Sequence, residues 1–376
     1  MSGGYRKYLR NVIPRMARHP DVEAVLCTFP MSLNGQDWFD SLTNVEFAHC
    51  SRFQSLDYGF TYNLKHALEK FCPDVLFIPT AHYVRFGNIA VVNMVRNMEP
   101  FAYSGRKNPF SERLRNIVRR KIASNAVRKS QRVIALSDYV KQFLVDNLNI
   151  SENKISVVHH GIHHDKCFKQ VRPPAVPESW KGDFLFTAGS IRPARGLEDI
   201  IYALKHLVAG KSDVNLLIAG AANPNMLPYL KSLKSKIAEL GLLKKVIWTG
   251  SLNQEEMNWC YKNCRLFVMT SRVEALAMIA LEALSRDCIC ITADSSCLPE
   301  VFGNAAVYYQ PENDRLLADT IQTTLAWSDR QRNEMYGLMR KRFAEFPSWD
   351  ETVEKTINEL KLAVERNNLK ETDAGN

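Results

Sequence analysis

The sequence lacks several features that mark particular classes of protein. No apolar run approaches the roughly 20 residues that a helix needs to cross a bilayer, so we expect no membrane-spanning segment. The nine cysteines include no Cys-x-x-Cys pair, and their odd number and wide scatter favour reduced thiols in a cytoplasmic protein. No Asp-x-Asp occurs. Nothing in the sequence therefore requires a bound metal, and we expect no cofactor.

Acidic residues are scarce in the first half of the chain. The protein has 376 residues, 46% of them hydrophobic and 24% charged, which is typical of a globular protein long enough for two domains. Residues 1–180 hold 25 Lys and Arg against 15 Asp and Glu, whereas the rest holds 24 against 25. A net charge of +9 therefore belongs almost entirely to the first half.

The positive charge is concentrated in residues 108–132, "NPFSERLRNIVRRKIASNAVRKSQR". This pattern favours contact with an anionic membrane surface or an anionic ligand, and a solvated helix face is the alternative. Nucleic acid is not expected, because no recognition motif occurs. Apolar residues in the segment fit a helical stripe beside the cations: Leu114, Ile117, Val118, Ile122 and Val127.

Short β-rich runs alternate with helical segments almost throughout, and the pattern occurs twice, on either side of the Pro-rich "VRPPAVPESW". This alternation predicts an α/β protein with two Rossmann-like, doubly wound parallel sheets. We expect an N-terminal domain at 1–170, a linker at 171–182 and a C-terminal domain at 183–345. Ligands of such folds bind outside the carboxyl ends of the strands, here in a cleft between the domains.

Four of the nine histidines lie within six residues of "VVHHGIHHDKCF", at 159, 160, 163 and 164. On a helix, the spacing of four would suit a metal site. Gly161 and the preceding strand-like run indicate a turn instead. We therefore predict no metal at His159, His160, His163 and His164, and interpret them as hinge residues or residues lining the cleft.

The segment "TSRVEALAMIALEALSRDCICITADSSCLPEV" places Glu274 in the loop after a strand and Glu282 in a helix predicted from Met278 to Ser285. The free N–H groups at a helix start favour an anion, and carboxylates accept hydrogen bonds from hydroxyls. The pair suits a phosphate-linked polyol. Two solvated helix carboxylates are the alternative.

A second segment, "FTAGSIRPARGLEDIIYAL", places Arg192 and Arg195 after another strand. Arginines at the carboxyl end of a strand can neutralise a diphosphate, and two surface arginines are the alternative. Gly3 and Gly4 open a basic helix, which is a weaker indication of an anion site.

These segments resemble the retaining glycosyltransferases of family four, which have the GT-B fold, and most of all the bacterial mannosyl- and rhamnosyl-transferase-like members that build cell-surface polysaccharides. The similarity covers almost the whole chain. "SRVEALAMIALEAL" resembles the family's Glu-x7-Glu element, "CICITADSSCLPEV" the segment after it, and "GSIRPARGLEDII" its basic loop. His160 and His163 stand where the family has Asn and Asp in an interdomain turn.

The resemblance implies a role for each matching position. Glu282 would hold the ribose of a nucleotide, Glu274 the donor sugar and Arg195 the diphosphate. Ser190 stands at the family's phosphate-binding Arg, and Arg192 would compensate for it. Arg96 falls near the family's cleft histidine. The remaining implied donor contacts are the backbone N–H groups of Leu276, Ala277 and Met278, the base-side residues Gly250, Ser251 and Leu252, and the N-terminal Gly3 and Gly4.

The chain departs from the family at its start, where the apolar strand that normally precedes the glycine loop is missing. The resemblance further implies that a helix at 346–366 crosses back to the N-terminal domain, followed by a flexible tail at 367–376. We expect metal-independent transfer of a sugar from a nucleoside-diphosphate sugar to a glycan or lipid-linked glycan, at a cytoplasmic site that can include the inner face of the membrane. The alternatives are a non-catalytic partner or scaffold protein, and an epimerase or phosphorylase of the same fold.

Overall fold

The computed structural model describes residues 3–30, 42–50, 62–103, 105, 107–163, 168–180 and 182–374. The chain divides into two compact units. The first unit takes in the chain up to Asn97, the stretch Val118–His163 and the chain from Pro347. The second takes in Met98–Ile117 and His164–Phe346. The predicted boundaries at 170 and 182 stay a prediction.

A four-stranded parallel sheet forms the centre of the first unit, in the order β3-β4-β5-β6. All six residues of β4 are buried, as expected of an inner strand covered on both faces. Its sequence, "AVVNMV", is apolar except for Asn93. The strands are β3 (Val75–Ile78), β4 (Ala90–Val95), β5 (Arg132–Ala135) and β6 (Ile155–Val157).

A separate two-stranded parallel sheet in the first unit joins β1 (Val25–Pro30) to β2 (Val45–Cys50). The first described element is a helix, α1 (Gly3–Ala17), so the described part of this unit has no strand ahead of the predicted glycine loop. In the described residues, β1 and β3 therefore each have a strand partner on one edge only. The predicted lack of a first strand stays a prediction.

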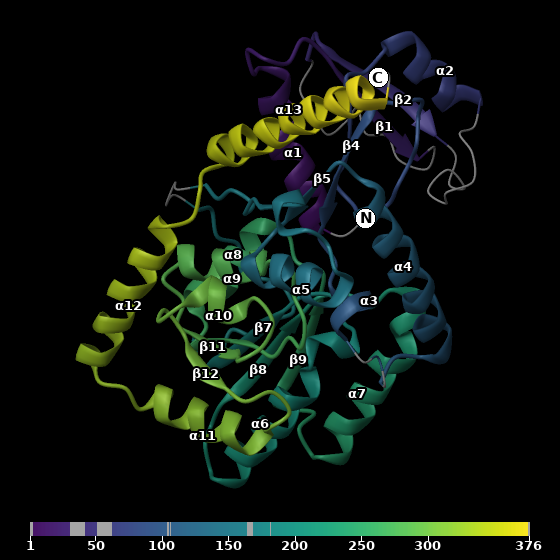
Figure 1. Ribbon diagram of the computed structural model, residues 1–376. Coiled ribbons are helices and arrows are strands. Elements are labelled where there is room, and N and C mark those ends of the chain that lie inside the picture. The colour runs from purple at the N-terminus through teal and green to yellow at the C-terminus, as the bar shows by residue number, and fades with distance from the viewer. Residues whose placement is uncertain are drawn as a thin grey trace. The chain divides into compact units, whose positions relative to one another are not determined.

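The long helix α13 (Trp349–Ala374) runs beside α1 and packs against β3, β4 and β5 of the first unit (Figure 1). It is anchored at its start, where Ile162 N–H donates to the Pro347 carbonyl and Thr352 Oγ1 donates to the His159 carbonyl. The other helices are α2 (Tyr62–Phe71), α4 (Phe110–Lys129), which continues from the second unit, α5 (Asp138–Leu148) and η3 (Glu152–Lys154).

The second unit is built on a six-stranded parallel sheet in the order β12-β11-β10-β7-β8-β9. The first strand in sequence, β7, lies inside the sheet, and the chain winds outward from it in both directions, as in doubly wound folds. The strands are β7 (Phe184–Ala188), β8 (Asn215–Ala219), β9 (Val246–Gly250), β10 (Leu266–Met269), β11 (Cys290–Ala293) and β12 (Val307–Tyr309).

Helices connect successive strands of this sheet, and α6 and α11 lie side by side (Figure 1). None of the described helices combines the length and apolar character that crossing a bilayer requires. The helices are α3 (Glu99–Ala102), η4 (Pro193–Arg195), α6 (Leu197–Ala209), η5 (Pro224–Met226), α7 (Leu227–Glu239), α8 (Gln254–Asn263), α9 (Met278–Ser285), α10 (Leu298–Phe302), α11 (Asp314–Leu325) and α12 (Asp329–Ala344).

Candidate active site

The loop between β7 and α6 lies close against the end of β10, the neighbouring strand. A Cβ added to Gly196, whose φ is +61°, would lie 2.3 Å from the Thr270 carbonyl oxygen, so only glycine fits there. Two hydrogen bonds hold the loop: Arg272 N–H to the Ala194 carbonyl at 2.8 Å, and Thr270 Oγ1 to the Arg195 carbonyl at 2.7 Å. The backbone thus fixes the position from which the Arg195 side chain starts.

The Arg195 side chain folds back over the end of β7. A Cβ added to Gly189 would lie 3.1 Å from the guanidinium carbon, so the missing side chain makes room for the cation. Arg195 Nη1 donates to Ser271 Oγ at 3.1 Å and forms an ion pair with Glu274. Two residues predicted separately, 79 positions apart, therefore meet at the carboxyl ends of β7 and β10.

The loop that carries Glu274 is held from the next strand, β11. Glu274 N–H donates to Ser296 Oγ at 3.0 Å, and Ser295 Oγ donates to the Ser271 carbonyl at 2.7 Å. Sequence reasoning missed Ser271, Ser295 and Ser296. No sequence signal distinguishes these serines, because they act through a strand neighbour that only the folded sheet supplies.

Helix α9 begins at Met278, as predicted, and no side chain caps its first turn. Such a start keeps its positive dipole end available to an anion. Two of the three predicted N–H donors have partners within the protein: Met278 N–H donates to the Leu276 carbonyl at 3.1 Å, and Ala277 N–H faces the Cys297 thiol. Burial, and next the Glu274 charge, raise the pKa of Cys297 well above its usual value.

Glu282 lies on α9 and is half-buried. The Tyr261 hydroxyl contacts it at 3.4 Å and the Ile279 carbonyl at 3.2 Å. Burial, and next the Glu282 charge, raise the pKa of Tyr261 well above its usual value, so this phenol stays protonated and can donate. The contact orients the carboxylate, which tells against the alternative of a fully solvated helix residue.

Arg192 makes a contact that the sequence did not predict. Its Nη1 donates to Glu99 Oε2 at 2.5 Å, and Asn108 Nδ2 donates to Glu99 Oε1 at 3.3 Å. Glu99 is 5% exposed, and Arg192 Nε is buried with no hydrogen-bond partner among the described residues. One signal could have identified Glu99, because it is the only acidic residue between Asp74 and Glu112.

A buried ion pair between Arg272 and Asp199 holds the elements around the site together. Both terminal nitrogens of Arg272 donate to the Asp199 carboxylate, at 2.6 and 2.5 Å. Asp199 also accepts from the Tyr309 hydroxyl at 2.9 Å and from Glu312 N–H at 3.0 Å. Because every oxygen of this carboxylate has a charged or polar partner, the arrangement fixes α6, the Glu274 loop and β12 together.

The other predicted donor residues of the second unit follow the carboxyl ends of its strands. Gly250 ends β9 with φ at +72°, and its carbonyl accepts from Gly220 N–H at 2.7 Å. Ser251 and Leu252 come directly after it, and Ser190 follows β7 as a half-buried residue. Their position agrees with the general rule for ligand sites, and their roles stay predictions.

In the first unit, the Arg96 guanidinium carbon lies 4.5 Å from the ring centre of Tyr5 and 5.3 Å from that of Tyr8. Burial lowers its pKa, although a guanidinium so placed over aromatic faces remains a cation. Both tyrosines come from α1, which opens at Gly3 and Gly4 as predicted. Arg96 thus lies beside the glycine-led helix.

The histidine segment is not helical at the described positions 158–163, where Ile162 forms a parallel β-bridge with Ser348. His160, however, is 2% exposed and stacks on Tyr8 with ring centres 4.5 Å apart, 6.0 Å from the ring of Trp349. The interpretation of His160 as a residue lining a cleft is therefore wrong: it is part of the first unit's core. Gly161 allows this segment to lie against the start of α13, since a Cβ there would lie 2.4 Å from the Trp349 backbone.

Among the residues that the structure describes, no group of three His, Cys, Asp or Glu side chains could hold a metal ion. His164, Asp165 and Cys167 lie outside the described residues. The predicted absence of a metal stays a prediction.

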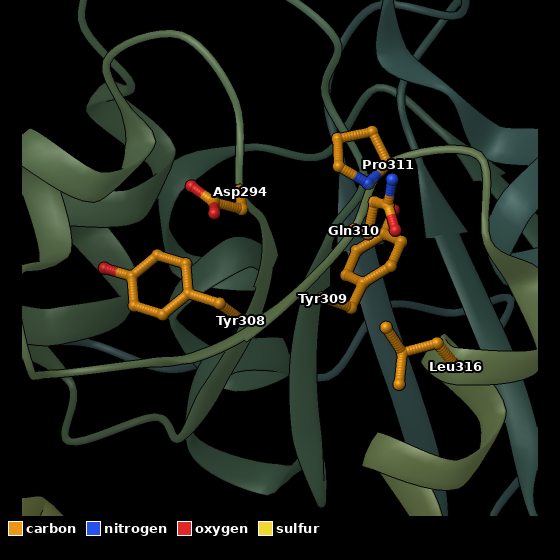
Figure 2. Close-up of a pocket in the computed structure, with 6 residues that line it drawn as sticks. All are labelled: Asp294, Tyr308, Tyr309, Gln310, Pro311 and Leu316. Carbon is orange, nitrogen blue, oxygen red and sulfur yellow. The ribbon is translucent and has the colours of Figure 1, made fainter.

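A small cavity of about 190 Å³ lies at the carboxyl ends of β11 and β12 (Figure 2). None of the predicted site residues lines it. It is smaller than the 300 Å³ or so at which small-molecule pockets begin, so it does not replace the Arg195–Glu274 region as the candidate site. Its lining residues are Asp294, Tyr308, Tyr309, Gln310, Pro311 and Leu316.

Both halves of the chain match models of glycosyltransferase families. Residues 2–166 match Glycosyltransferase Family 4, and residues 173–339 match Glycosyl transferases group 1. The matched stretches meet near the predicted linker. Each half of the chain is thus similar to a glycosyltransferase family.

Characterised and uncharacterised relatives share low identity with the chain. An uncharacterised glycosyltransferase of Methanocaldococcus jannaschii is 24% identical over 63% of this chain and 61% of its own length. The O-antigen chain mannosyltransferase RfbU of Salmonella typhimurium is 21% identical over 83% of this chain and 84% of its own. Against the serotype-specific mannosyltransferase WbdA of Escherichia coli, at 21% identity, the match spans 66% of this chain but only 30% of the relative.

Solved structures confirm the predicted GT-B fold. HepE of Anabaena, solved with UDP-glucose, has a TM-score of 0.72 at 16% identity and covers 96% of this chain and 97% of its own. A glycosyltransferase of Rickettsia africae has a TM-score of 0.68 at 15% identity, with 96% of each chain covered. At such identities the likeness establishes the fold alone.

Proposed function

We propose that this GT-B protein transfers a sugar, with retention of configuration, from a nucleoside-diphosphate sugar to an acceptor hydroxyl of a glycan or glycolipid. The observation that carries the proposal is the contact of the Arg195 guanidinium with Glu274 and Ser271, beside the uncapped start of α9. This arrangement combines a cation for a leaving phosphate with a carboxylate for sugar hydroxyls.

In the proposed reaction, the bond between the anomeric carbon and the diphosphate oxygen breaks, and a bond to the acceptor oxygen forms on the same face. The acceptor's proton goes to the leaving phosphate. Arg195, assisted by the dipole of α9, stabilises the charge that develops on the diphosphate. These groups give the charge stabilisation that a metal ion supplies in other transferases, so we propose a metal-independent reaction without a cofactor.

The remaining residues take the roles that the resemblance implies. Glu282, oriented by Tyr261, accepts hydrogen bonds from the ribose hydroxyls, and Glu274 accepts them from the donor sugar. Gly250 and the two residues after it receive the base. Arg96 and the Gly3–Gly4 start of α1 bind anionic or polar groups of the substrates. HepE was solved with UDP-glucose and RfbU is a mannosyltransferase of a polysaccharide, which supports a nucleotide-sugar donor and a cell-surface glycan acceptor.

The proposal is tested by nucleotide release from a panel of UDP- and GDP-sugars, with and without acceptors, followed by NMR of the product's anomeric linkage. We expect one donor family to release nucleotide and its nucleoside diphosphate to raise the unfolding temperature. At about 100 times its dissociation constant, a ligand stabilises by about 2.7 kcal/mol. Stabilisation without any turnover would favour the non-catalytic alternative, and an inverted linkage would refute retention.

We also propose a cytoplasmic location at the inner face of a membrane, where a lipid-linked acceptor would be available. The support for this location is the charge of the first 180 residues and the surface of α4.

A further inference from the structure

Helix α4 carries an apolar surface that is exposed in the described part of the structure. Ten large hydrophobic side chains are exposed in the described part of the chain, and four of them fall within nine residues of this one helix. The other six are scattered singly over separate elements: Val171, Leu227, Leu243, Leu316, Leu338 and Leu369. The four on α4, here called the α4 stripe, are Phe110 (72% exposed), Leu114 (49%), Ile117 (56%) and Val118 (53%).

The α4 stripe lies opposite the face by which the helix packs. At 100° per residue its four members fall within an arc of about 100°. The buried residues Ala123, Ala126 and Val127 cluster around the opposite direction, about 180° away. The helix therefore needs only one of its two apolar faces for folding. The sequence had placed Val127 in the same stripe as Leu114, and this was wrong, because 13 residues turn a helix by about 220° from a whole number of turns.

Cations surround the stripe. The helix sequence holds seven Lys and Arg residues against one acid, Glu112. Lys121 falls inside the arc of the stripe, and Arg113 and Arg120 flank it, about 40° and 60° outside its nearer boundary. All three are exposed. Their long apolar stems can lie along the stripe while the charged ends reach outward.

We propose that α4 docks on an anionic lipid bilayer, with the α4 stripe entering the headgroup and upper acyl region and the flanking cations binding lipid phosphates. An apolar stripe bordered by Lys and Arg, on a helix too polar to cross a bilayer, is the pattern of interfacial helices. Charge complementarity selects the partner, since each cation near an anionic surface adds attraction of about 1 kcal/mol. The inference rests on the membrane location proposed above and names the surface that makes the contact, but it does not depend on the sugar chemistry.

The test is co-sedimentation of the full chain with vesicles of phosphatidylcholine, with and without phosphatidylglycerol, at low and high salt. We expect binding only to the anionic vesicles, weakened by salt. The double change Leu114→Ser and Ile117→Ser should weaken it about tenfold or more, because two inserted side chains are lost. Its matched control is Leu243→Ser with Leu338→Ser, two exposed leucines outside α4, which should bind as the parent does.

A second pair of variants separates charge from insertion. Arg120→Gln with Lys121→Gln should weaken binding about 25-fold, since about 1 kcal/mol per cation corresponds to about fivefold. Lys231→Gln with Lys234→Gln, two exposed cations of α7, should leave it unchanged. All four variants should unfold at the parent's temperature, because only exposed side chains change.

Three results would overturn the proposal: no binding of the parent to anionic vesicles at low salt, equal losses in the control variants, or unchanged binding in Leu114→Ser with Ile117→Ser. Sedimentation of the protein without lipid tests the rival interpretation, in which the stripe joins two copies of the chain. A parent dimer that this double change dissociates, without any vesicle binding, would make the stripe a contact between two copies of the chain.

Discussion

Removing the charge of Glu274 should slow turnover without weakening the binding of the bare nucleotide. Glu274 forms an ion pair with Arg195 in the free protein, and their side chains are only 14% and 22% exposed. In Glu274→Gln the guanidinium stays in place, still held by Ser271, but it loses its neutralising partner. The diphosphate then binds beside an Arg195 guanidinium whose positive charge is no longer neutralised by Glu274. The donor sugar, however, loses the carboxylate that accepts from its hydroxyls.

The magnitude follows from the burial of the pair. A buried polar group left without its partner costs about 1–3 kcal/mol, which predicts a kcat lower by about fivefold to 150-fold. The effect on the nucleoside diphosphate has the opposite sign and is smaller, because solvent still reaches both side chains. An exposed ion pair contributes up to about 1 kcal/mol, so we expect affinity unchanged or up to about fivefold tighter.

The assay is calorimetric binding of UDP and GDP alongside turnover of the matching donor. Glu282→Gln should mainly raise KM and weaken nucleotide binding, whereas Glu274→Gln mainly lowers kcat. The reason is that the ribose is present in substrate, transition state and product. Arg195→Gln should lower kcat and also weaken binding of the diphosphate, which is charged throughout. Glu334→Gln, an exposed carboxylate of α12, controls for the loss of a charge.

Two results would refute the reasoning. Loss of nucleotide binding in Glu274→Gln but not in Glu282→Gln would reverse the two assignments. Parent-like kinetics in both variants, with an active parent, would mean that the chemistry takes place elsewhere in the protein.

Three further predictions follow from single contacts. Glu99→Gln should tighten UDP or GDP binding a few-fold in calorimetry, because it releases Arg192 from its carboxylate partner; unchanged or weaker binding would contradict this. Burial holds the pKa of His160 well below its usual value, so below about pH 6.5 only the unfolded chain takes up this proton, and stability should fall as the pH falls. In denaturant titrations at about pH 7.5 and about pH 5.5, His160→Phe, which keeps the stack on Tyr8, should lose less stability on acidification than the parent; an equal loss would assign the effect to other groups. Gly220→Ala should destabilise by about 3 kcal/mol, since its Cβ would lie 1.8 Å from the Gly189 carbonyl oxygen; Gly241→Ala, which has a positive φ but open space, should cost only about 1 kcal/mol, and equal costs would mean that the clash is relieved.

Sequence periodicity was enough to predict the sheets and the helix that follows Glu274. The run at β4 is apolar at all positions but Asn93, a pattern typical of a strand buried on both faces. Met278 begins α9 as predicted because the residues from 278 to 285 are strong helix formers after a loop. Both features are local, and local preference decides them.

The contacts within the candidate site could not be predicted in the same way. Arg195 and Glu274 meet because β7 pairs with β10, and strand order depends on packing across the whole sheet. The contact between Arg272 and Asp199, which lie 73 residues apart, could not be predicted for the same reason. Glu99 reaches the site from a segment that the sequence assigns to the first domain, although it packs with the second unit.

The contact with Glu99 changes the role predicted for Arg192. Ser190 stands where the family has a phosphate-binding Arg, and Arg192 is the only other cation of that loop besides Arg195. An arginine already paired with a buried carboxylate adds little net attraction for a phosphate, because the phosphate must compete with Glu99. Arg192 should therefore contribute only where that carboxylate is neutral. On this reasoning Arg192→Gln barely changes diphosphate affinity in the parent but weakens it in Glu99→Gln, and additive effects in this double-mutant cycle would show that the two residues act separately.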